Sequence, residues 1–353
     1  MKTADQILEQ VVSGQRLSAE DAIFLFEKAE LTDLGKAALA VRNQKHPKPE
    51  VTYIIDRNIN YTNVCVTDCK FCAFYRHEGD SDAYVLTKDQ LKQKIIETQE
   101  LGGNQILLQG GHNPKMKLDW YVDLLKFIKS MGIHIHAFSG PEIYFFSKLN
   151  KMPIREVIRT LRAAGWDSLP GGGAEILTDR VRALINPQKA KVDPWIEVHR
   201  TAHEEGMRST ATMMFGHVET FQDRVEHMQV LRDLQDETKG FTAFIPWTFQ
   251  SQNTAMSDVP MTTSFDYLRT LAISRLFFDN IDNLQASWVT QGPKIGQISL
   301  MFGCNDMGSI MIEENVVRNA GAAFRMTSAQ TEKLISDAGF TPKKRNFFYQ
   351  HLN

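Results

Sequence analysis

The sequence predicts an α/β fold, a (β/α)8 barrel of the TIM type with an N-terminal helical cap and a C-terminal helical extension. Eight short apolar or β-branched runs follow residue 50, amphipathic stretches separate them, and glycine or proline signals lie between the two kinds of segment. Such alternation is typical of parallel strands joined by crossover helices. An open, doubly wound sheet is the alternative, because periodicity alone does not distinguish it from a closed barrel.

Residues 1–48 are expected to form the helical cap. Apolar residues recur at helical spacing from residue 7 onward, and Ser18 is suited to cap a second helix. Two prolines within 46–50 indicate a linker to the next unit. The predicted domains are 1–48 for the cap, 49–310 for the barrel and 311–353 for a helical extension packed on the barrel.

The expected barrel strands lie between helices with recognisable ends. Thr87 and Gln90 have the capping-box spacing, and Asp193 followed by Pro194 is a second helix start. Glycines after the amphipathic stretches mark where helices end. The expected strands cover 51–55, 105–111, 133–140, a short run from 168, 208–215, 241–249, 284–289 and 304–309.

The composition argues against several classes of protein. Forty basic and 42 acidic residues give a net charge of −2, so we expect no nucleic-acid partner and no anionic membrane surface as a partner. No apolar run reaches the ~18 residues of a membrane span, and the first residues lack the apolar segment of a signal peptide. Four cysteines, three of them clustered, do not suit a secreted disulfide scaffold. We therefore expect a cytoplasmic protein.

The loop after the first expected strand carries Cys65, Cys69 and Cys72, with the spacing Cys-x3-Cys-x2-Cys. Cubane iron–sulfur clusters normally take four thiolates, so three on one loop leave one iron open to a small molecule. The alternatives are ordinary buried cysteines and a structural zinc site, which would need a fourth ligand such as His77 and usually paired ligands. An electron-transfer protein would normally supply a fourth cysteine. Cys304 is distant in sequence and is expected in the core.

In a barrel of this type the site forms at the carboxyl ends of the strands. Two glycines after the second strand allow the backbone to approach a ligand. Ser139 and Glu142 after the third strand are either ligand contacts or a helix cap with an acidic first turn. Glu175 follows three consecutive glycines, whose entropic cost makes a simple turn a poor explanation.

Later strand ends carry further candidates. His217 follows the fifth strand and is either a proton acceptor or a structural histidine. Trp247, Gln250 and Asn253 follow the sixth, where an aromatic platform with amides suits a ring and a sugar, or is part of the core. The last two strands end at Ser287-Trp288 and Asn305-Asp306. The basic and aromatic tail 343–349 is expected to be packed and solvated rather than a partner site.

The cysteine loop closely resembles that of the radical S-adenosylmethionine (SAM) enzymes. Within that superfamily, several segments together resemble the dehypoxanthine futalosine cyclase family of menaquinone biosynthesis, over about residues 50–325. Aminofutalosine synthase and the deazaflavin synthase subunits share the loop and the barrel and are the alternatives. The segments that carry the resemblance are 60–75, 108–114, 168–177, 213–220, 244–250 and 286–289.

The resemblance implies two cofactors and their contacts. Cys65, Cys69 and Cys72 would bind a [4Fe–4S] cluster, with SAM on the open iron. Gly110 and Gly111 would present backbone carbonyls to the SAM amino group, and Glu175 would contact the SAM ribose. Arg180 and Arg182 are candidates for the SAM carboxylate, although a solvated helix face is the expected account of both. The full set of expected SAM contacts is Tyr75, Gln109, Gly110, Gly111, Ser139 and Glu175.

The resemblance also implies the reaction. A 5′-deoxyadenosyl radical would take hydrogen from the ribose of dehypoxanthine futalosine, and the ribose radical would close a carbon–carbon bond onto the attached benzoate ring. His217 is the first candidate for the base that restores aromaticity, with Glu142 and Asp306 as rivals. The expected partners are this small-molecule substrate and an electron donor such as flavodoxin or ferredoxin.

Overall fold

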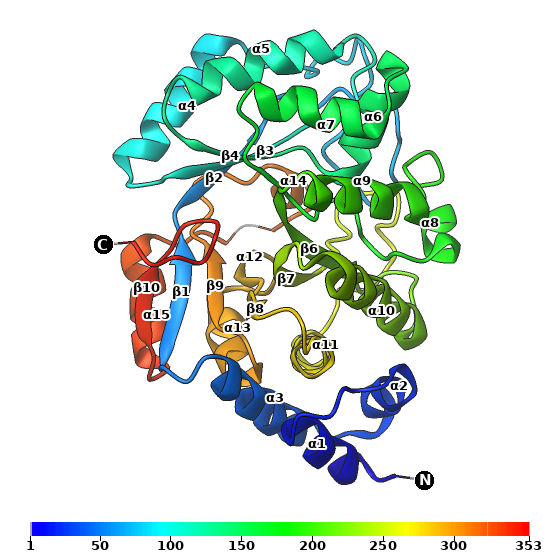
Figure 1. The fold of residues 1–353 in the computed structure, drawn as a ribbon, viewed down its shortest axis with the longest axis vertical. Coiled ribbons are helices and arrows are strands. Elements are labelled where there is room, and N and C mark those ends of the chain that lie inside the picture. Colours follow the sequence, from blue (N-terminus) through cyan, green and yellow to red (C-terminus); the bar gives the residue numbers. More distant parts are fainter. Residues whose placement is uncertain (1, 323, 353) are drawn as a thin grey trace.

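Parallel strands arranged in chain order form the centre of the computed structural model, which describes residues 2–322 and 324–352 (Figure 1). One sheet has seven strands in the order β2-β3-β4-β5-β6-β7-β8, and a second has three in the order β10-β1-β9. The strands are β1 (Glu50–Ile54), β2 (Asp56–Asn60), β3 (Gln105–Gln109), β4 (His134–Ala137), β5 (Ser168–Leu169), β6 (Arg208–Phe215), β7 (Phe241–Thr248), β8 (Asn283–Leu284), β9 (Asp306–Ser309) and β10 (Thr341–Lys344).

The two sheets join into a barrel at two places. β1 and β2 form one run interrupted at Ile55; β1 pairs with β9, and β2 pairs with β3. On the other side, a parallel bridge between Gln285 and Asp306 connects the residue after β8 to β9. Because the order from β2 to β8 follows the chain without reversal and β9 pairs with β1, the open doubly wound sheet is excluded and the predicted barrel is confirmed.

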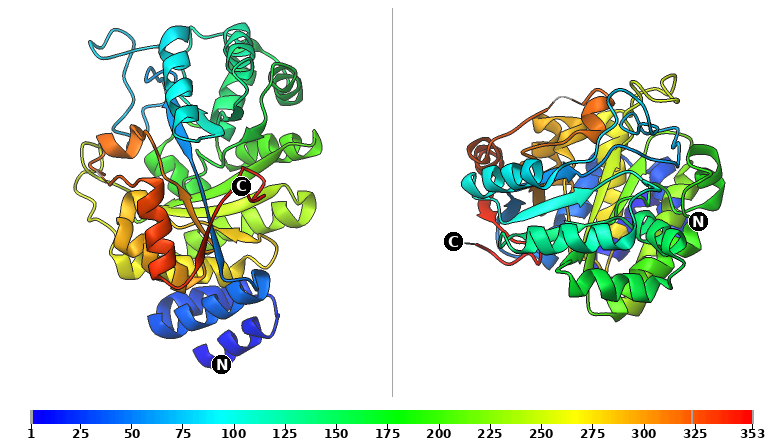
Figure 2. Two further views of the ribbon diagram at one scale, coloured as in Figure 1. Left: turned by 90° about the vertical axis from the view of Figure 1, so that its left-hand side faces the viewer. Right: turned by 90° about the horizontal axis from the view of Figure 1, so that it is seen from above.

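Helices cover the outside of the barrel (Figure 2). Thr87 accepts a hydrogen bond from Gln90 N in the predicted capping box of α4. The helices between strands are α4 (Lys88–Glu100), α5 (Leu118–Lys129), α6 (Gly140–Asn150), α7 (Ile154–Ala163), α8 (Asp179–Ile185), α9 (Val192–Glu204), α10 (Phe221–Thr238), α11 (Ser264–Phe277), α12 (Trp288–Gln291), α13 (Pro293–Ile298) and a 3₁₀ turn at Ser299–Phe302.

The N-terminal segment forms the expected cap below the barrel in Figure 1. It consists of α1 (Ala4–Val12), α2 (Ala19–Lys28) and α3 (Leu31–Lys45). Ser18 caps α2 by accepting a hydrogen bond from Asp21 N, as the sequence predicted. α3 packs mainly against α11 and α2 against α10, so the cap lies far from the strand ends that carry the cysteine loop.

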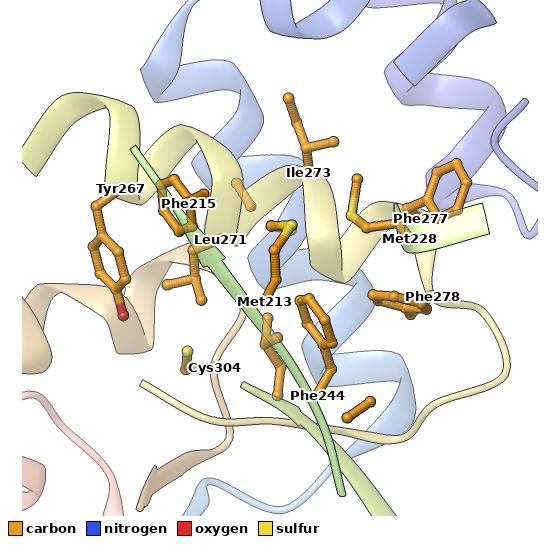
Figure 3. Close-up of a cluster of buried hydrophobic side chains, with 14 of the residues drawn as sticks. Met213, Phe215, Met228, Phe244, Tyr267, Leu271, Ile273, Phe277, Phe278 and Cys304 are labelled. Atoms are coloured by element: carbon orange, nitrogen blue, oxygen red, sulfur yellow. The ribbon is translucent and has the colours of Figure 1, made fainter. Parts of the chain in front are cut away.

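The core beneath the later strands is apolar, and Figure 3 shows part of it. Met213, Phe215 and Phe244 project from β6 and β7 against α11. Cys304 lies in the same cluster with no exposed surface, and burial raises the pKa of its thiol. The prediction that this cysteine belongs to the core is confirmed.

The C-terminal tail contains one element that the sequence did not predict. It forms the helices α14 (Val316–Asn319) and α15 (Ser328–Asp337), and then β10. β10 pairs in parallel with β1, with Glu50 opposite Thr341. The last residues of the chain therefore lie beside the first strand of the barrel. In the described residues, no helix is both long and apolar enough to cross a bilayer.

Candidate functional site

The cysteine loop leaves the end of β2 and is held by backbone hydrogen bonds. Cys65 N donates to the carbonyl of Arg76 at 3.0 Å, and Val66 N donates to that of His112 at 3.2 Å. Cys72 N donates to the carbonyl of Cys69 at 3.0 Å, which fixes the second half of the loop. The three cysteines are thus presented from one ordered segment at the carboxyl ends of the strands.

The thiols lie in a poorly solvated environment. Cys65 and Cys69 are buried, and Cys72 is partly buried. Thr67 Oγ1 lies 3.0 Å from Cys65 Sγ and accepts a hydrogen bond from Cys69 Sγ at 3.6 Å. Burial raises the pKa of Cys69 to about 12 and also raises that of Cys72. Such thiols become thiolates when a metal binds them, so the loop suits metal ligands rather than free nucleophiles.

The spacing of the three cysteines in the sequence is compatible with a cluster. Among the described residues, no three histidine, cysteine or carboxylate side chains converge on the position of a single ion. A cubane cluster has separate corners, so its three ligands do not need to converge in that way. The chemistry of the donor set, three cysteine sulfurs on one short loop, fits a [4Fe–4S] cluster.

Gly110 and Gly111 pack directly against the cysteine loop. A Cβ on Gly111 would lie 2.2 Å from the carbonyl oxygen of Val64, and one on Gly110 would lie 2.5 Å from the ring of Tyr61. Gly111 N also donates to the carbonyl of Thr62 at 3.0 Å. These glycines are required for the loop to lie where it does. Their contact with SAM stays a prediction.

Glu142 connects the loop to the second and third strand ends. It is 2 % exposed, and its carboxylate accepts hydrogen bonds from Tyr61 Oη at 2.7 Å, Gly110 N at 3.1 Å and both the backbone N and Oγ of Ser139 at 2.7 Å. Ser139 and Glu142 form the capping box of α6. Burial raises the pKa of Glu142 despite these donors. The capping interpretation is therefore confirmed for both residues.

Glu175 lies in a buried cluster of charges that the sequence did not predict. Lys189, between α8 and α9, donates to Glu175 Oε1 at 3.1 Å, and its ammonium lies 5.4 Å from the ring centre of Phe71 in the cysteine loop. Burial lowers the pKa of Lys189, but the Glu175 carboxylate outweighs it and the net pKa is raised. Glu175 has a left-handed backbone, with φ of 43°, which costs an ordinary residue ~1–3 kcal/mol.

The second carboxylate oxygen of Glu175, Oε2, forms an ion pair with Nη1 of Arg182 at 3.6 Å. It is buried and has no hydrogen-bond partner among the described residues. A buried acceptor without a hydrogen bond is costly, and a ribose hydroxyl or an amino group would satisfy it. This acceptor lies beside the cysteine loop and is suited to bind SAM, just as the thiols are suited to bind the cluster. No sequence signal pointed to Lys189, because it lies in a loop without a motif.

The two arginines after the fourth strand differ in environment. Arg180 forms a half-exposed ion pair with Asp223, in keeping with a solvated helix face. Arg182 is 3 % exposed and donates to the carbonyls of Ala174 and Ala190, so its expected solvated position is wrong. α8 turns this side chain inward, where it supports the backbone on both sides of Glu175.

A cavity of about 280 Å³ lies inside the barrel. Its lining combines apolar and aromatic walls with a few polar groups, which is typical of small-molecule sites. Gln109, Trp247, Ser287 and Trp288, all predicted, are among the lining residues. Gln250 is buried elsewhere and Asn253 donates to the carbonyl of Asn319, so these two amides do not line the cavity.

The C-terminal tail contributes to the same cavity. Arg345, Phe347 and Tyr349 are among its lining residues, so the tail is part of the site and not only solvated packing. Arg345 pairs with Asp306, through Nε at 2.5 Å and Nη2 at 2.9 Å, and its guanidinium stacks 4.0 Å from the ring centre of Tyr349. The three lining residues stand at every second position of a basic and aromatic stretch, and that was the available signal for this role.

The remaining predicted residues lie around this site. Tyr75 is partly buried next to His77, and burial raises its pKa. His217 has no exposed side-chain surface; Nε2 contacts the carbonyl of Met214 and Nδ1 accepts from Val218 N. Asp306 is fully buried and paired with Arg345. His217, Glu142 and Asp306 are not among the described residues that line the cavity, and a base role for any of them stays a prediction.

A parallel barrel that presents three cysteine thiols at its strand ends, next to an internal ligand cavity, defines a barrel enzyme with an iron–sulfur cluster. Comparison with known proteins supports this class of enzyme and identifies the superfamily. Residues 59–231 match the radical SAM superfamily, and residues 238–353 match the CofH/MqnC C-terminal region. Methylornithine synthase has a similar solved structure, with a TM-score of 0.75 at 18 % identity over 95 % of this chain and 97 % of that one.

Relatives of similar length are much closer in sequence. The cyclic dehypoxanthine futalosine synthase of Halalkalibacterium halodurans is 47 % identical, over 98 % of this chain and 94 % of its own. The aminodeoxyfutalosine synthase of Thermus thermophilus is 38 % identical, over 98 % and 95 %. The chain belongs to the radical SAM superfamily, and within it to the family of these futalosine-pathway enzymes. Its cofactors are accordingly a [4Fe–4S] cluster and SAM.

Proposed function

We propose that the chain converts dehypoxanthine futalosine into cyclic dehypoxanthine futalosine, a step of menaquinone biosynthesis. The observation that carries the proposal is the 47 % identity to a cyclic dehypoxanthine futalosine synthase over nearly the full length of both chains. The internal cavity of about 280 Å³ supports it, because a linked ring and sugar need an enclosed, largely apolar site.

When bound, the cluster supplies one electron to SAM, and SAM supplies the radical that takes a hydrogen atom from the substrate. The protein itself binds and orients the reactants, and it excludes water from the site. Cys65, Cys69 and Cys72 would hold the cluster, and Glu175 would hold SAM through Oε2, which has no hydrogen-bond partner among the described residues. Gln109 lines the cavity, and a Cβ on Gly172 would lie 2.6 Å from its amide nitrogen; these residues would separate SAM from the substrate.

The aromatic walls suit the benzoate part of this substrate. Trp247 and Trp288 both line the cavity, and Trp288 is fixed by its indole hydrogen bond to the carbonyl of Ser309 at 2.9 Å. Rigid aromatic surfaces hold a ring in one orientation at a low entropic cost. The ribose radical is then kept close to the ring carbon with which it forms a bond.

The electron donor is proposed to be a small flavodoxin or ferredoxin. The cysteine loop lies at the strand ends, and Val66 within it is 42 % exposed, which allows a redox partner to approach. We also infer a cytoplasmic location, where such donors and an oxygen-sensitive cluster are kept reduced, with no nucleic-acid or membrane partner.

The decisive experiment is an anaerobic incubation of the reconstituted enzyme with reductant, SAM and dehypoxanthine futalosine, followed by mass spectrometry. The expected product is lighter than the substrate by two hydrogens, with one 5′-deoxyadenosine formed per product. The alternative is aminodeoxyfutalosine synthesis, because the aminodeoxyfutalosine synthase of Thermus thermophilus is 38 % identical to this chain. A product that has gained a SAM-derived adenosyl group would establish that alternative and refute cyclisation.

A further inference from the structure

Two histidines and one serine form a connected chain at the wall of the cavity. His136, on β4, lines the cavity and is 6 % exposed. Its Nδ1 lies 2.8 Å from Oγ of Ser168, the first residue of the neighbouring β5. The same oxygen lies 2.8 Å from Nε2 of His134, two residues earlier on β4. One hydroxyl therefore links a histidine in the cavity to a second one outside it.

The chemistry of a hydroxyl makes this link directional. Ser168 Oγ carries one hydrogen, so it donates to one imidazole nitrogen and accepts from the other. With Nδ1–H on His136 and an unprotonated Nε2 on His134, a hydrogen bond runs from each group to the next. In the described part of the chain, no hydrogen bond engages Nε2 of His136, which leaves that nitrogen free to accept from a ligand.

The surroundings keep both rings neutral. Burial lowers the pKa of His136 well below its usual value, and the charges of His134 and Arg345 lower it further. Burial also lowers the pKa of His134, which Asp167 partly offsets. The ring of Phe347 in the tail covers both, at 4.8 Å from His136 and 5.3 Å from His134. Asp56 lines the same cavity from β2, and burial raises its pKa.

The outer end of this hydrogen-bonded series, at His134, lies near solvent. His134 is half-buried at the start of β4, next to Asp167 and the partly exposed Phe348. Asp167 forms an ion pair with Lys129 near the surface. A proton that reaches His134 is therefore one step from water.

We propose that His136 accepts the proton released when the aromatic ring of the product is restored, and that Ser168 and His134 pass this proton to solvent. The inference rests on the proposed cyclisation and identifies its proton acceptor.

The step balances as follows. After the ribose radical adds to the ring, the ring carbon that was attacked still carries its hydrogen, and one unpaired electron is spread over the ring. That electron passes to a one-electron acceptor of the iron–sulfur class, which regains the electron spent on SAM cleavage. In the same step the C–H bond breaks, its electron pair restores the aromatic ring, and the proton goes to Nε2 of His136. Loss of the electron makes this C–H bond strongly acidic, so a weak, neutral base is sufficient, and without the base the ring radical persists.

Position distinguishes His136 from the three base candidates predicted from the sequence. Both ring nitrogens of His217 are already engaged, Glu142 accepts four hydrogen bonds, and Asp306 is paired with Arg345. None of these three is a lining residue of the cavity within the described ranges, whereas His136 is.

The test compares His136→Asn and Ser168→Ala with the wild type in anaerobic assays with dehypoxanthine futalosine. The readout is cyclic product formed per 5′-deoxyadenosine, with the organic radical followed by electron paramagnetic resonance. In both variants we expect first-turnover 5′-deoxyadenosine within about twofold of the wild type. Product per 5′-deoxyadenosine should fall at least tenfold, because a positioned base contributes ~10²–10⁴-fold. A ring-centred radical should accumulate.

Ser168→Thr keeps the hydroxyl and is the matched control, which should return the product ratio toward the wild-type value. Ser168→Ala leaves His136 in place, so it decides the question if His136→Asn does not fold. A wild-type ratio in Ser168→Ala and in any folded His136→Asn protein, with the wild type active, overturns the relay and leaves the proposed function intact. A wild type that forms no cyclic product refutes the proposed function itself.

Discussion

Tyr61 donates its phenolic hydrogen to the carboxylate of Glu142 over 2.7 Å, and both side chains are almost completely buried. Tyr61 lies four residues before the first cluster cysteine, and Glu142 also accepts from Gly110 N. One carboxylate therefore holds the cysteine loop, the glycine pair and the start of α6 in a fixed arrangement. The stability of the loop depends on this buried contact.

Replacing Tyr61 with phenylalanine should weaken that arrangement. The Glu142 carboxylate would lose a donor in a buried site, which costs ~1–3 kcal/mol. We expect this loss in urea unfolding, together with slower cluster incorporation. Tyr144→Phe is the control, because the half-buried Tyr144 has no hydrogen bond from its hydroxyl among the described residues. Equal unfolding free energies for Tyr61→Phe and the wild type would contradict the expectation.

Gly111→Ala should displace the cysteine loop. The new Cβ would lie 2.2 Å from the Val64 carbonyl oxygen and 2.9 Å from Cβ of Cys65. Because the obstacle is backbone, the loop itself must move, and we expect less than half of the wild-type iron content after reconstitution. Gly132→Ala is the control: it has a left-handed φ of 72° but open space around it. It should cost ~1–2 kcal/mol of stability and retain full iron content.

The cysteines should fall into two groups. Changing Cys65, Cys69 or Cys72 to alanine removes one of three protein ligands, so visible cluster absorbance and SAM cleavage should both be lost. Cys304→Ala should keep both, because Cys304 lies in the apolar core shown in Figure 3. Full cluster absorbance without Cys69 would refute the ligand assignment.

Stability should decrease as the pH falls below about 7, and His227 should account for part of the decrease. Burial lowers the pKa of His227 to about 3, and its Nδ1 accepts a hydrogen bond from Leu177 N at 2.9 Å. In the unfolded chain a histidine has a pKa of ~6.5, so between these values the unfolded state binds the extra proton and protonation favours unfolding. One such group contributes up to ~1.4 kcal/mol per pH unit.

His227→Gln should therefore reduce the slope of unfolding free energy against pH between 7 and 5.5 by up to that amount. The measurement is urea unfolding at several pH values within this window. His351→Gln, at an exposed position, should leave the slope as it is in the wild type. An unchanged slope in His227→Gln would show that His227 does not titrate in this range.

Arg345→Met should be strongly destabilising. It leaves the Asp306 carboxylate without its cation in a site with no solvent exposure, which costs ~3–5 kcal/mol. Adding Asp306→Asn should recover much of this loss, since the uncompensated charge is then removed. Lys343→Met removes an exposed cation 3.9 Å from Glu50 and should cost at most ~1 kcal/mol. Urea unfolding compares the wild type, the single variants Arg345→Met and Asp306→Asn, the double variant and Lys343→Met, and additive effects of the Arg345 and Asp306 changes would contradict coupling.

The barrel could be predicted because its strands carry local signals. β3, β6 and β7 are apolar runs bounded by glycines or capped helices, and they occur where expected. β10 could not be predicted, because Thr-Pro-Lys-Lys has no apolar pattern and becomes a strand only by pairing with β1. Arg182 was misplaced for a related reason: its burial depends on the carbonyls that α8 brings around it.

The site residues likewise divide into those that local sequence signals predict and those that depend on tertiary contacts. The cysteine spacing is local, and the strand ends that carry Gln109, Ser139 and Glu175 could be located from the barrel order. Lys189 and His136 could not be recognised as site residues. Lys189 depends on a loop that folds back over Phe71, and His136 depends on which wall of the barrel faces the cavity.

The pairing of β10 with β1 has a consequence for biosynthesis. Residue 341 lies opposite residue 50, and the tail that follows supplies Arg345, Phe347 and Tyr349 to the cavity. On the ribosome, the cap and the early strands emerge long before these residues are made. The part of the cavity wall that these three residues form can therefore be completed only after residues 341–349 have been made. A nascent chain that has already folded its cysteine loop would still lack this wall.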